Sequence, residues 1–113
     1  MADLKDRGML DTTTIVCAGE FGRTPRINPN NGRDHFPAAW SAVIAGGGVK
    51  GGQAYGKTSP DGSEVEENKV TTADFLATVC HAVGVNPDKQ NMSNIGRPIR
   101  IVDNGRPIRD LVG

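Results

Sequence analysis

Short apolar runs alternate along this chain with long polar stretches that are rich in glycine. The run Thr12–Ala18 is β-branched and apolar and is flanked by turn-type residues, which predicts a buried strand. Because it is almost continuously apolar, we expect a parallel strand covered on both faces. A second apolar run, Ala38–Ala45, predicts another strand, and Gly46–Gly52 after it predicts a turn or a close approach of two backbones.

Helical spacing occurs in two places. Leu4–Leu10 is typical of the end of a helix, and Thr71–Val83 is the clearest helix in the sequence. Thr71 with Asp74 three residues later matches a capping box, and Gly84 suits the C-terminal end. One apolar stripe on this helix should face the core: Phe75, Leu76, Val79, Cys80 and Val83.

The polar stretches predict loops and hairpins. Gly19–Pro37 has no apolar period and predicts a long loop, and such loops are usually functional or disordered. Gln53–Lys69 predicts a surface hairpin whose acidic run is a solvated face. Near the end, the sequence GRPIR occurs at Gly96–Arg100 and again at Gly105–Arg109, on either side of an Asn-Gly pair. We therefore expect a terminal β-hairpin with both arms at sheet edges, where proline is tolerated.

Composition limits the core and the possible partners. With 36% apolar residues and 15 glycines in 113 residues, the chain fits one domain, spanning residues 1–113, with a modest core. Its formal net charge is zero, so electrostatics favour neither nucleic acid nor a membrane surface as a partner. Arg26, Arg33 and Lys50 are candidates for a local anion site. Met1–Leu10 is charged and is not a signal peptide, so the compartment stays open.

Three residues with reactive side chains have ordinary structural interpretations. Cys17 and Cys80 are far apart in the sequence, and we expect both to be buried free thiols. His81 falls opposite the apolar stripe of the predicted helix, so we expect a surface histidine rather than a metal ligand.

The segment Gly51–Thr58 matches the phosphate-loop pattern G-x-x-x-x-G-K-[ST]. That pattern binds phosphate only where its Lys-Thr pair opens a helix, whose N-terminal amides hold the anion. Here Lys57 and Thr58 precede Ser59-Pro60-Asp61-Gly62, a turn sequence. Nucleotide binding through this loop is therefore the weaker alternative for the function.

The long loop carries the best candidates for chemistry. Glu20 follows the first predicted strand, at the edge where open α/β sheets bind ligands, and Asp34 and His35 lie later in the same loop. Carboxylate and imidazole groups are ordinary ligands of zinc and similar ions, and Arg23 can hold a phosphate- or sulfate-like anion. The structural alternative is that Glu20 and Arg23 form an ion pair that fixes the loop, while Asp34 caps a turn.

Several runs in family order resemble the C-terminal half of the DUF1501 proteins. They are GEFGRTP, GRDHFPAAWSAVIAGGGVKGGQAYGKTS, VTTADFLATVCHAVGV and the closing GRPIRIVDNGRPIRDL. That family is similar to the alkaline phosphatase and sulfatase superfamily. The resemblance implies a partial three-layer α/β/α sandwich, with a divalent metal such as zinc or calcium at the strand ends. It also implies the export of full-length relatives.

By this resemblance Glu20 matches an acidic strand-end ligand, and Asp34 with His35 matches a later pair. Because Glu-Phe stands where relatives have Asp-His, a second alignment places Asp34 and His35 at the strand end itself, and both alignments stay open. The superfamily's nucleophile belongs to an N-terminal half, so no catalytic residue is assigned here.

We therefore expect the C-terminal part of a metal-dependent phosphatase- or sulfatase-like protein, inactive without a missing N-terminal half or another chain. Its substrate would be a small molecule that carries a phosphate or sulfate. A non-catalytic binding or structural module is the alternative.

Overall fold

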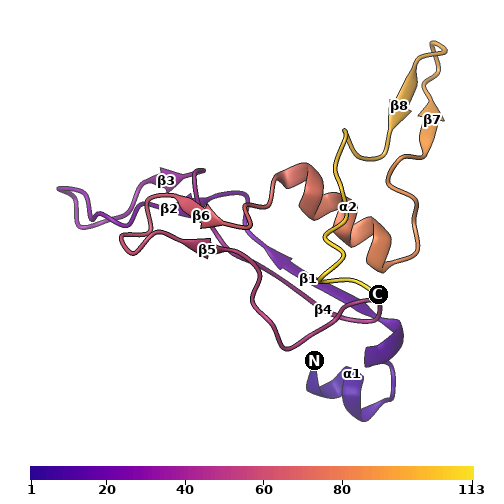
Figure 1. Cartoon of the computed structure of the whole chain (residues 1–113), viewed down its shortest axis with the longest axis horizontal. Helices are drawn as coiled ribbons and strands as arrows, with labels where there is room; N and C mark the ends of the chain where they lie inside the picture. Colours follow the sequence, from indigo (N-terminus) through magenta and orange to yellow (C-terminus); the bar gives the residue numbers. More distant parts are fainter. The chain divides into compact units, whose positions relative to one another are not determined.

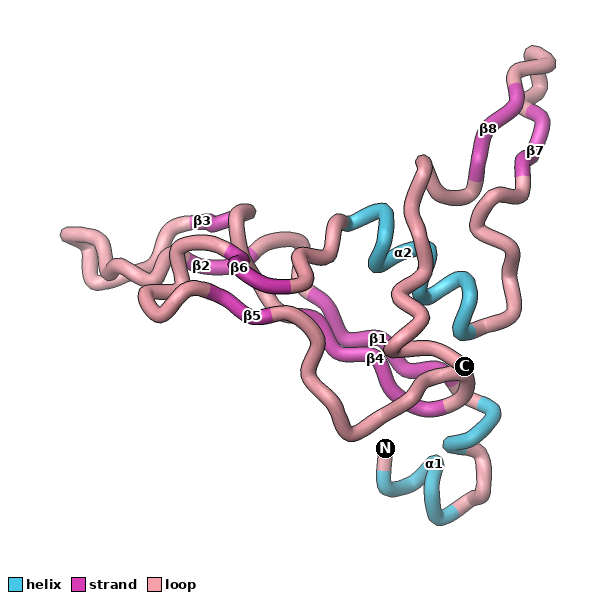
Figure 2. The backbone as a smooth tube through the Cα atoms, viewed as in Figure 1, coloured by secondary structure: helices cyan, strands magenta, loops and turns pink.

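The computed structural model describes every residue from Met1 to Gly113 and combines helices with strands (Figure 1), which confirms a mixed α/β chain. Loops make up most of it, as Figure 2 shows. The helices are α1 (Ala2–Asp6), the 3-10 turn η1 (Leu10–Thr12) and α2 (Thr72–Ala82). The strands are β1 (Thr14–Ala18), β2 (Gly22–Arg23), β3 (His35–Phe36), β4 (Ala42–Gly46), β5 (Lys57–Thr58), β6 (Val65–Glu67), β7 (Gln90–Met92) and β8 (Pro98–Arg100).

The strands form four two-stranded sheets, which pair β1 with β4, β2 with β3, β5 with β6 and β7 with β8. The chain divides into two compact units. We call Met1–Ile15, Ile44–Gln53 and Val70–Gly113 the helix unit, and Val16–Val43 with Ala54–Lys69 the hairpin unit. Neither helix has the length and apolar content needed to span a lipid bilayer.

Local signals placed α2 correctly. The Thr71 hydroxyl accepts a hydrogen bond from the Asp74 amide at 3.1 Å, and the Asp74 carboxylate accepts one from the Thr71 amide at 3.4 Å. This reciprocal capping box satisfies two of the free N–H groups at the start of the helix. Gly84 follows the helix with φ +75°, the left-handed conformation that glycine adopts without strain. Both ends of the predicted helix are thus confirmed.

The buried face of α2 differs from the one that the apolar stripe predicts. Its fully buried residues are Ala77 and Thr78, whereas Leu76 and Val83 on the stripe are 47% and 54% exposed. The segment after β8 packs on the opposite, polar face through directed hydrogen bonds. The Thr78 hydroxyl accepts one from the Ile108 amide at 3.0 Å and donates one to the Asp74 carbonyl at 2.6 Å. Polar anchoring therefore selects the buried face.

Because of the same hydrogen bonds to α2, the predicted terminal hairpin does not form. Residues Gly105–Arg109 form no strand, because the Arg106 and Ile108 amides donate to Asp74 and Thr78 of α2. The observed hairpin lies one segment earlier: β8 pairs antiparallel with β7, and Asn91 stands opposite Ile99. The Asn-Gly signal was wrong because Gly105 lies against α2, where a Cβ would stand 2.0 Å from the Ala73 carbonyl oxygen.

The glycine-rich segment after β4 makes the predicted turn and close approach. A Cβ on Gly46 would stand 2.0 Å from the Thr13 carbonyl oxygen, and one on Gly47 would stand 2.6 Å from that of Asp11. Val49 then forms a bridge with Val112, which ties the C-terminal end of the chain to this turn.

The first strand is less buried than predicted. Val16 is 43% exposed, and Cys17 and Ala18 are exposed as well, so the expected cover on both faces is absent. Cys17 is a free but exposed thiol, which corrects the expectation that it is buried, and Cys80 is half-buried. The buried apolar residues of the chain are Ala77, Val102 and Val112, all in the helix unit.

Candidate functional site

The segment after β1 contains a short hairpin within the predicted loop. Strands β2 and β3 pair antiparallel, so that Gly22 stands opposite Phe36 and Arg23 opposite His35. Gly22 has no room for a side chain, since a Cβ there would lie 2.2 Å from the Ala39 carbonyl oxygen. The hairpin therefore places an arginine and a histidine side by side on neighbouring strands.

Hydrogen bonds from Asn28 order the tip of this hairpin. Its side-chain oxygen accepts bonds from the amides of Asn30 and Gly32, both at 3.0 Å. Its side-chain nitrogen donates to Asp34 Oδ1 at 2.9 Å. Asn28, rather than Asp34, thus caps the turn, and Asp34 keeps its second carboxylate oxygen free of bonds in this hairpin.

Thr24 and Arg33 fix the position of Asp34. The Thr24 amide donates to the Asp34 carbonyl at 3.0 Å, and the Asp34 amide donates to the Thr24 hydroxyl at 3.1 Å. The Arg33 guanidinium donates to the carbonyls of Thr24 and Pro25. In the helix unit, Lys50 likewise donates to the Arg109 carbonyl. Of the three residues considered for an anion site, Arg33 and Lys50 thus donate hydrogen bonds to backbone carbonyls, and Arg26 is exposed.

An aromatic stack supports His35, and the only sign of it in the sequence is a phenylalanine in a glycine-rich loop. The Phe21 and His35 rings stack with centroids 3.9 Å apart and an angle of 28° between their planes. The guanidinium carbon of Arg23 lies 5.5 Å from the centre of the Phe21 ring. The favourable contact of a cation with an aromatic face brings Arg23 into the same cluster.

The predicted site residues are exposed, and they converge only in part. Asp34, His35 and Arg23 share the β2–β3 hairpin, and Glu20 lies just before β2. The ion pairs of the chain are Arg7–Asp3 and Lys57–Glu67, so Glu20 and Arg23 do not form the pair considered above.

The chain contains no group of three or more His, Cys, Asp or Glu side chains that could hold a metal ion. Glu20, Asp34 and His35 therefore do not make a complete ligand set in this arrangement.

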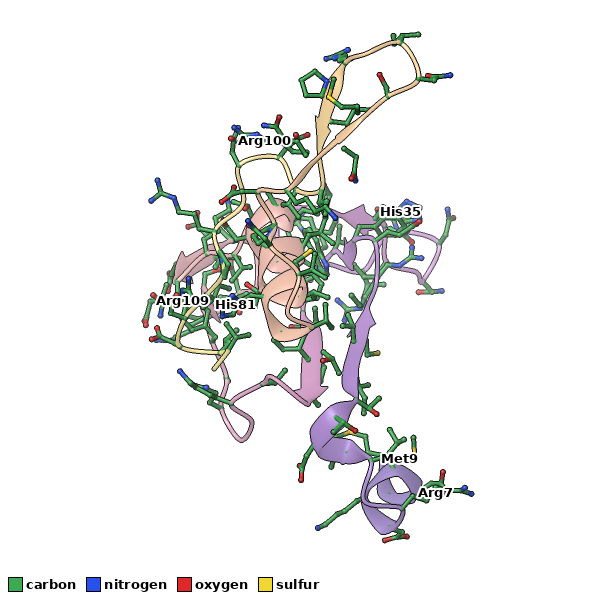
Figure 3. All side chains as sticks on the ribbon, turned by 90° about the vertical axis from the view of Figure 1, so that its right-hand side faces the viewer. Arg7, Met9, His35, His81, Arg100 and Arg109 are labelled. Carbon is green, nitrogen blue, oxygen red and sulfur yellow. The ribbon has the colours of Figure 1, made fainter.

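His81 has a different environment from the one predicted. It is half-buried on the face of α2 that the C-terminal segment covers, and its Nε2 lies 3.0 Å from Arg109 Nη1 (Figure 3). As a guanidinium can only donate, Nε2 of His81 is the acceptor in this contact. A structural role in anchoring the C-terminal segment explains this histidine.

The segment Gly51–Thr58, which matches the phosphate-loop pattern, does not have the structure that binds phosphate. Lys57 and Thr58 form strand β5 and open no helix, and Lys57 pairs with Glu67 at 3.1 Å. The turn that follows is built on the buried Ser59. Hydrogen bonds from the hydroxyls of Ser59 and Ser63 lower the pKa of Asp61 from 3.8 to about 2. This segment is an ordered hairpin turn, as predicted from the sequence.

The chain belongs to the protein family of unknown function DUF1501, whose family model matches residues 1–112. No curated protein and no solved structure matches the chain.

Proposed function

We propose that this chain contributes one part of a metal-dependent hydrolase-like site for phosphate or sulfate esters, in a three-layer α/β/α fold, and is inactive alone. The observation that carries the proposal is the β2–β3 register. It sets Arg23 opposite His35 and next to Asp34, so that an anion-binding group and two metal-binding groups occupy one short hairpin.

With Glu20, Asp34 and His35 as ligands the donor chemistry suits zinc, whereas calcium would use the two carboxylates and further oxygen ligands. Asp34 offers the carboxylate oxygen that Asn28 does not occupy, and the Phe21 stack orients the imidazole of His35. Since no three donors converge, the remaining ligands would come from another segment of polypeptide. A bound metal would polarise the ester and stabilise developing negative charge.

Arg23 would hold the non-bridging oxygens of the substrate. One of its nitrogens donates to the Arg33 carbonyl at 3.2 Å, which fixes the side chain along the hairpin. A guanidinium has five N–H donors, so several stay available for an oxyanion. The Phe21 face restricts the guanidinium further and lowers the entropy lost on binding an anion.

The test is the metal content of a full-length family member that carries these positions. Glu20→Ala combined with His35→Ala should remove the bound metal and the hydrolysis of p-nitrophenyl phosphate or sulfate. His81→Ala is the matched control, because that imidazole serves the C-terminal segment. Unchanged metal content in the double variant would show that the ligand assignment is wrong.

A non-catalytic module is the second candidate, and the hydrogen bonds by which Asn28 and Arg33 order the hairpin favour it, because they give these polar side chains a structural role. It predicts that a full-length member hydrolyses neither ester, even when zinc or calcium is supplied. A shift of the melting temperature with ATP would instead support the Gly51–Thr58 alternative, against the strand geometry of Lys57 and Thr58.

A further inference from the structure

The β7–β8 hairpin of the helix unit exposes apolar side chains on an ordered arm. We call Lys89–Ile101 the basic arm. It extends away from α2 (Figure 1), and Met92, Ile95 and Ile99 in it are 67%, 83% and 54% exposed. An isolated two-stranded hairpin is marginally stable in water, and burying these exposed apolar side chains against a partner would stabilise it. The arm is therefore suited to packing against another surface.

The charges of the arm have one sign. Lys89, Arg97 and Arg100 are basic, and no acidic residue lies between positions 89 and 101. Arg100 donates to the Asn104 side chain at 2.7 Å, which leaves its charge without a carboxylate partner in this hydrogen bond. The arm thus presents a basic surface that contains no acidic residue of its own.

Only one edge of the arm can accept a further strand. The Ser93 amide donates to the Arg97 carbonyl, and the Ile101 amide donates to the Lys89 carbonyl. The alternation of an antiparallel ladder then directs the N–H and C=O groups of Gln90 and Met92 outward. On the other edge Pro98 has no N–H to offer. The β7 edge is therefore the open one.

The hairpin unit provides a surface of opposite charge. We call Lys57–Lys69 the acidic hairpin, which contains four acidic and two basic residues. Glu67 pairs with Lys57 at 3.1 Å, whereas the exposed Glu64 and Glu66 have no ion pair within the unit. Glu66 belongs to β6 and Glu64 directly precedes it; β6 has a single partner, β5, so its other edge is open.

We propose that the basic arm of one copy of this chain docks on the acidic hairpin of a second copy, with β7 alongside β6. Opposite charges align the two hairpins, and burial of Met92 supplies apolar contact. The two surfaces differ, so the contact is heterologous. The rotation that relates one copy to the next decides whether the copies close into a ring or form a longer assembly. This proposal is independent of the site on the β2–β3 hairpin.

Sedimentation velocity of the whole chain over a range of concentrations is the first test. We expect reversible association that weakens at high salt, because exposed charges are screened within a Debye length of about 3 Å at 1 M. A monomer at every concentration, or an association that salt leaves unchanged, would overturn the proposal.

Charge reversal is the second test. Arg97→Glu with Arg100→Glu, and separately Glu64→Lys with Glu66→Lys, should each abolish self-association while far-ultraviolet circular dichroism stays unchanged. Mixing these two variants, or combining all four changes in one chain, should restore it. Lys5→Glu in α1 with Arg7→Glu at its C-terminal cap is the control and should still associate. Loss without restoration would refute the pairing of these two hairpins.

Discussion

At the residue scale, Gly48 shows how closely the turn after β4 approaches α2. Its φ is +75°, and a Cβ added there would lie 2.1 Å from the Ala82 carbonyl oxygen. The obstacle is backbone, which cannot rotate away as a flexible side chain could. Gly84 has the same φ with open space around it, and Gly51 has open space and no positive φ. Substituting these three glycines in turn therefore separates two contributions to the free energy of unfolding: the strain of a left-handed backbone and the clash of a Cβ with α2.

We predict that Gly48→Ala destabilises the chain most, Gly84→Ala less and Gly51→Ala least. The left-handed conformation alone costs a non-glycine residue roughly 1–2 kcal/mol, which Gly84→Ala isolates. Gly48→Ala adds the displacement of α2 from the turn, whereas a surface change such as Gly51→Ala stays within about 0.5 kcal/mol. Thermal unfolding followed by circular dichroism measures the order. Equal melting temperatures for the first two variants would show that the close approach costs nothing.

At the element scale, Asp74 links the start of α2 to the C-terminal segment. Its carboxylate accepts hydrogen bonds from the Thr71 hydroxyl at 2.6 Å and the Arg106 amide at 2.9 Å. These bonds, that of Thr71 foremost, lower the pKa of Asp74 below its ordinary value of 3.8. In the unfolded chain the carboxyl binds its proton at a higher pH, so the ionised form stabilises the folded chain.

We predict that this stabilisation is present above pH 3.8 and is lost as the pH falls through the lowered pKa of the folded state. Asp74→Asn should lower the melting temperature at neutral pH and flatten its decline in acid, so that the two proteins converge. Asp103→Asn is the control, because that carboxylate makes no hydrogen bond to Thr71 or Arg106. Parallel pH curves for wild type and Asp74→Asn would contradict the assignment.

The predicted helix and the predicted terminal hairpin show which sequence signals are sufficient to predict a secondary-structure element. The helix α2 was predictable, because its capping box and terminal glycine act between residues a few positions apart. The terminal hairpin was not, because the amides of Arg106 and Ile108 bond to side chains about 30 positions earlier. A turn signal such as Asn104-Gly105 competes with such distant partners, and the sequence alone does not reveal them.

At the scale of the whole molecule, the candidate site shows the same difference between local and distant signals. The sequence could indicate where to look for it, since a long glycine-rich loop after an apolar run is typical of a functional segment. The stack of Phe21 on His35 and the bonds that Arg33 makes to the loop backbone required the hairpin register, which no local signal supplied. Burial was overestimated for β1, because an apolar run indicates a strand without showing what covers it.

The uneven core implies that local stability differs between the two units. All buried apolar residues belong to the helix unit, whereas the buried residue of the hairpin unit is the polar Ser59. Regions with few buried apolar contacts open at low free energy. Native-state hydrogen exchange should therefore show amide protection in α2 and at Ile108 that exceeds that of Thr24 and Asp34 by at least about tenfold.

The amides of Ile108, Thr24 and Asp34 are all hydrogen-bonded. The Ile108 amide donates to the hydroxyl of the fully buried Thr78. In the exposed β2–β3 hairpin, the Thr24 amide donates to the Asp34 carbonyl and the Asp34 amide donates to the Thr24 hydroxyl. A difference in protection therefore reports the surroundings of the bond rather than its presence. Equal protection in both units would mean that they unfold as one cooperative body, despite the concentration of buried apolar residues around α2.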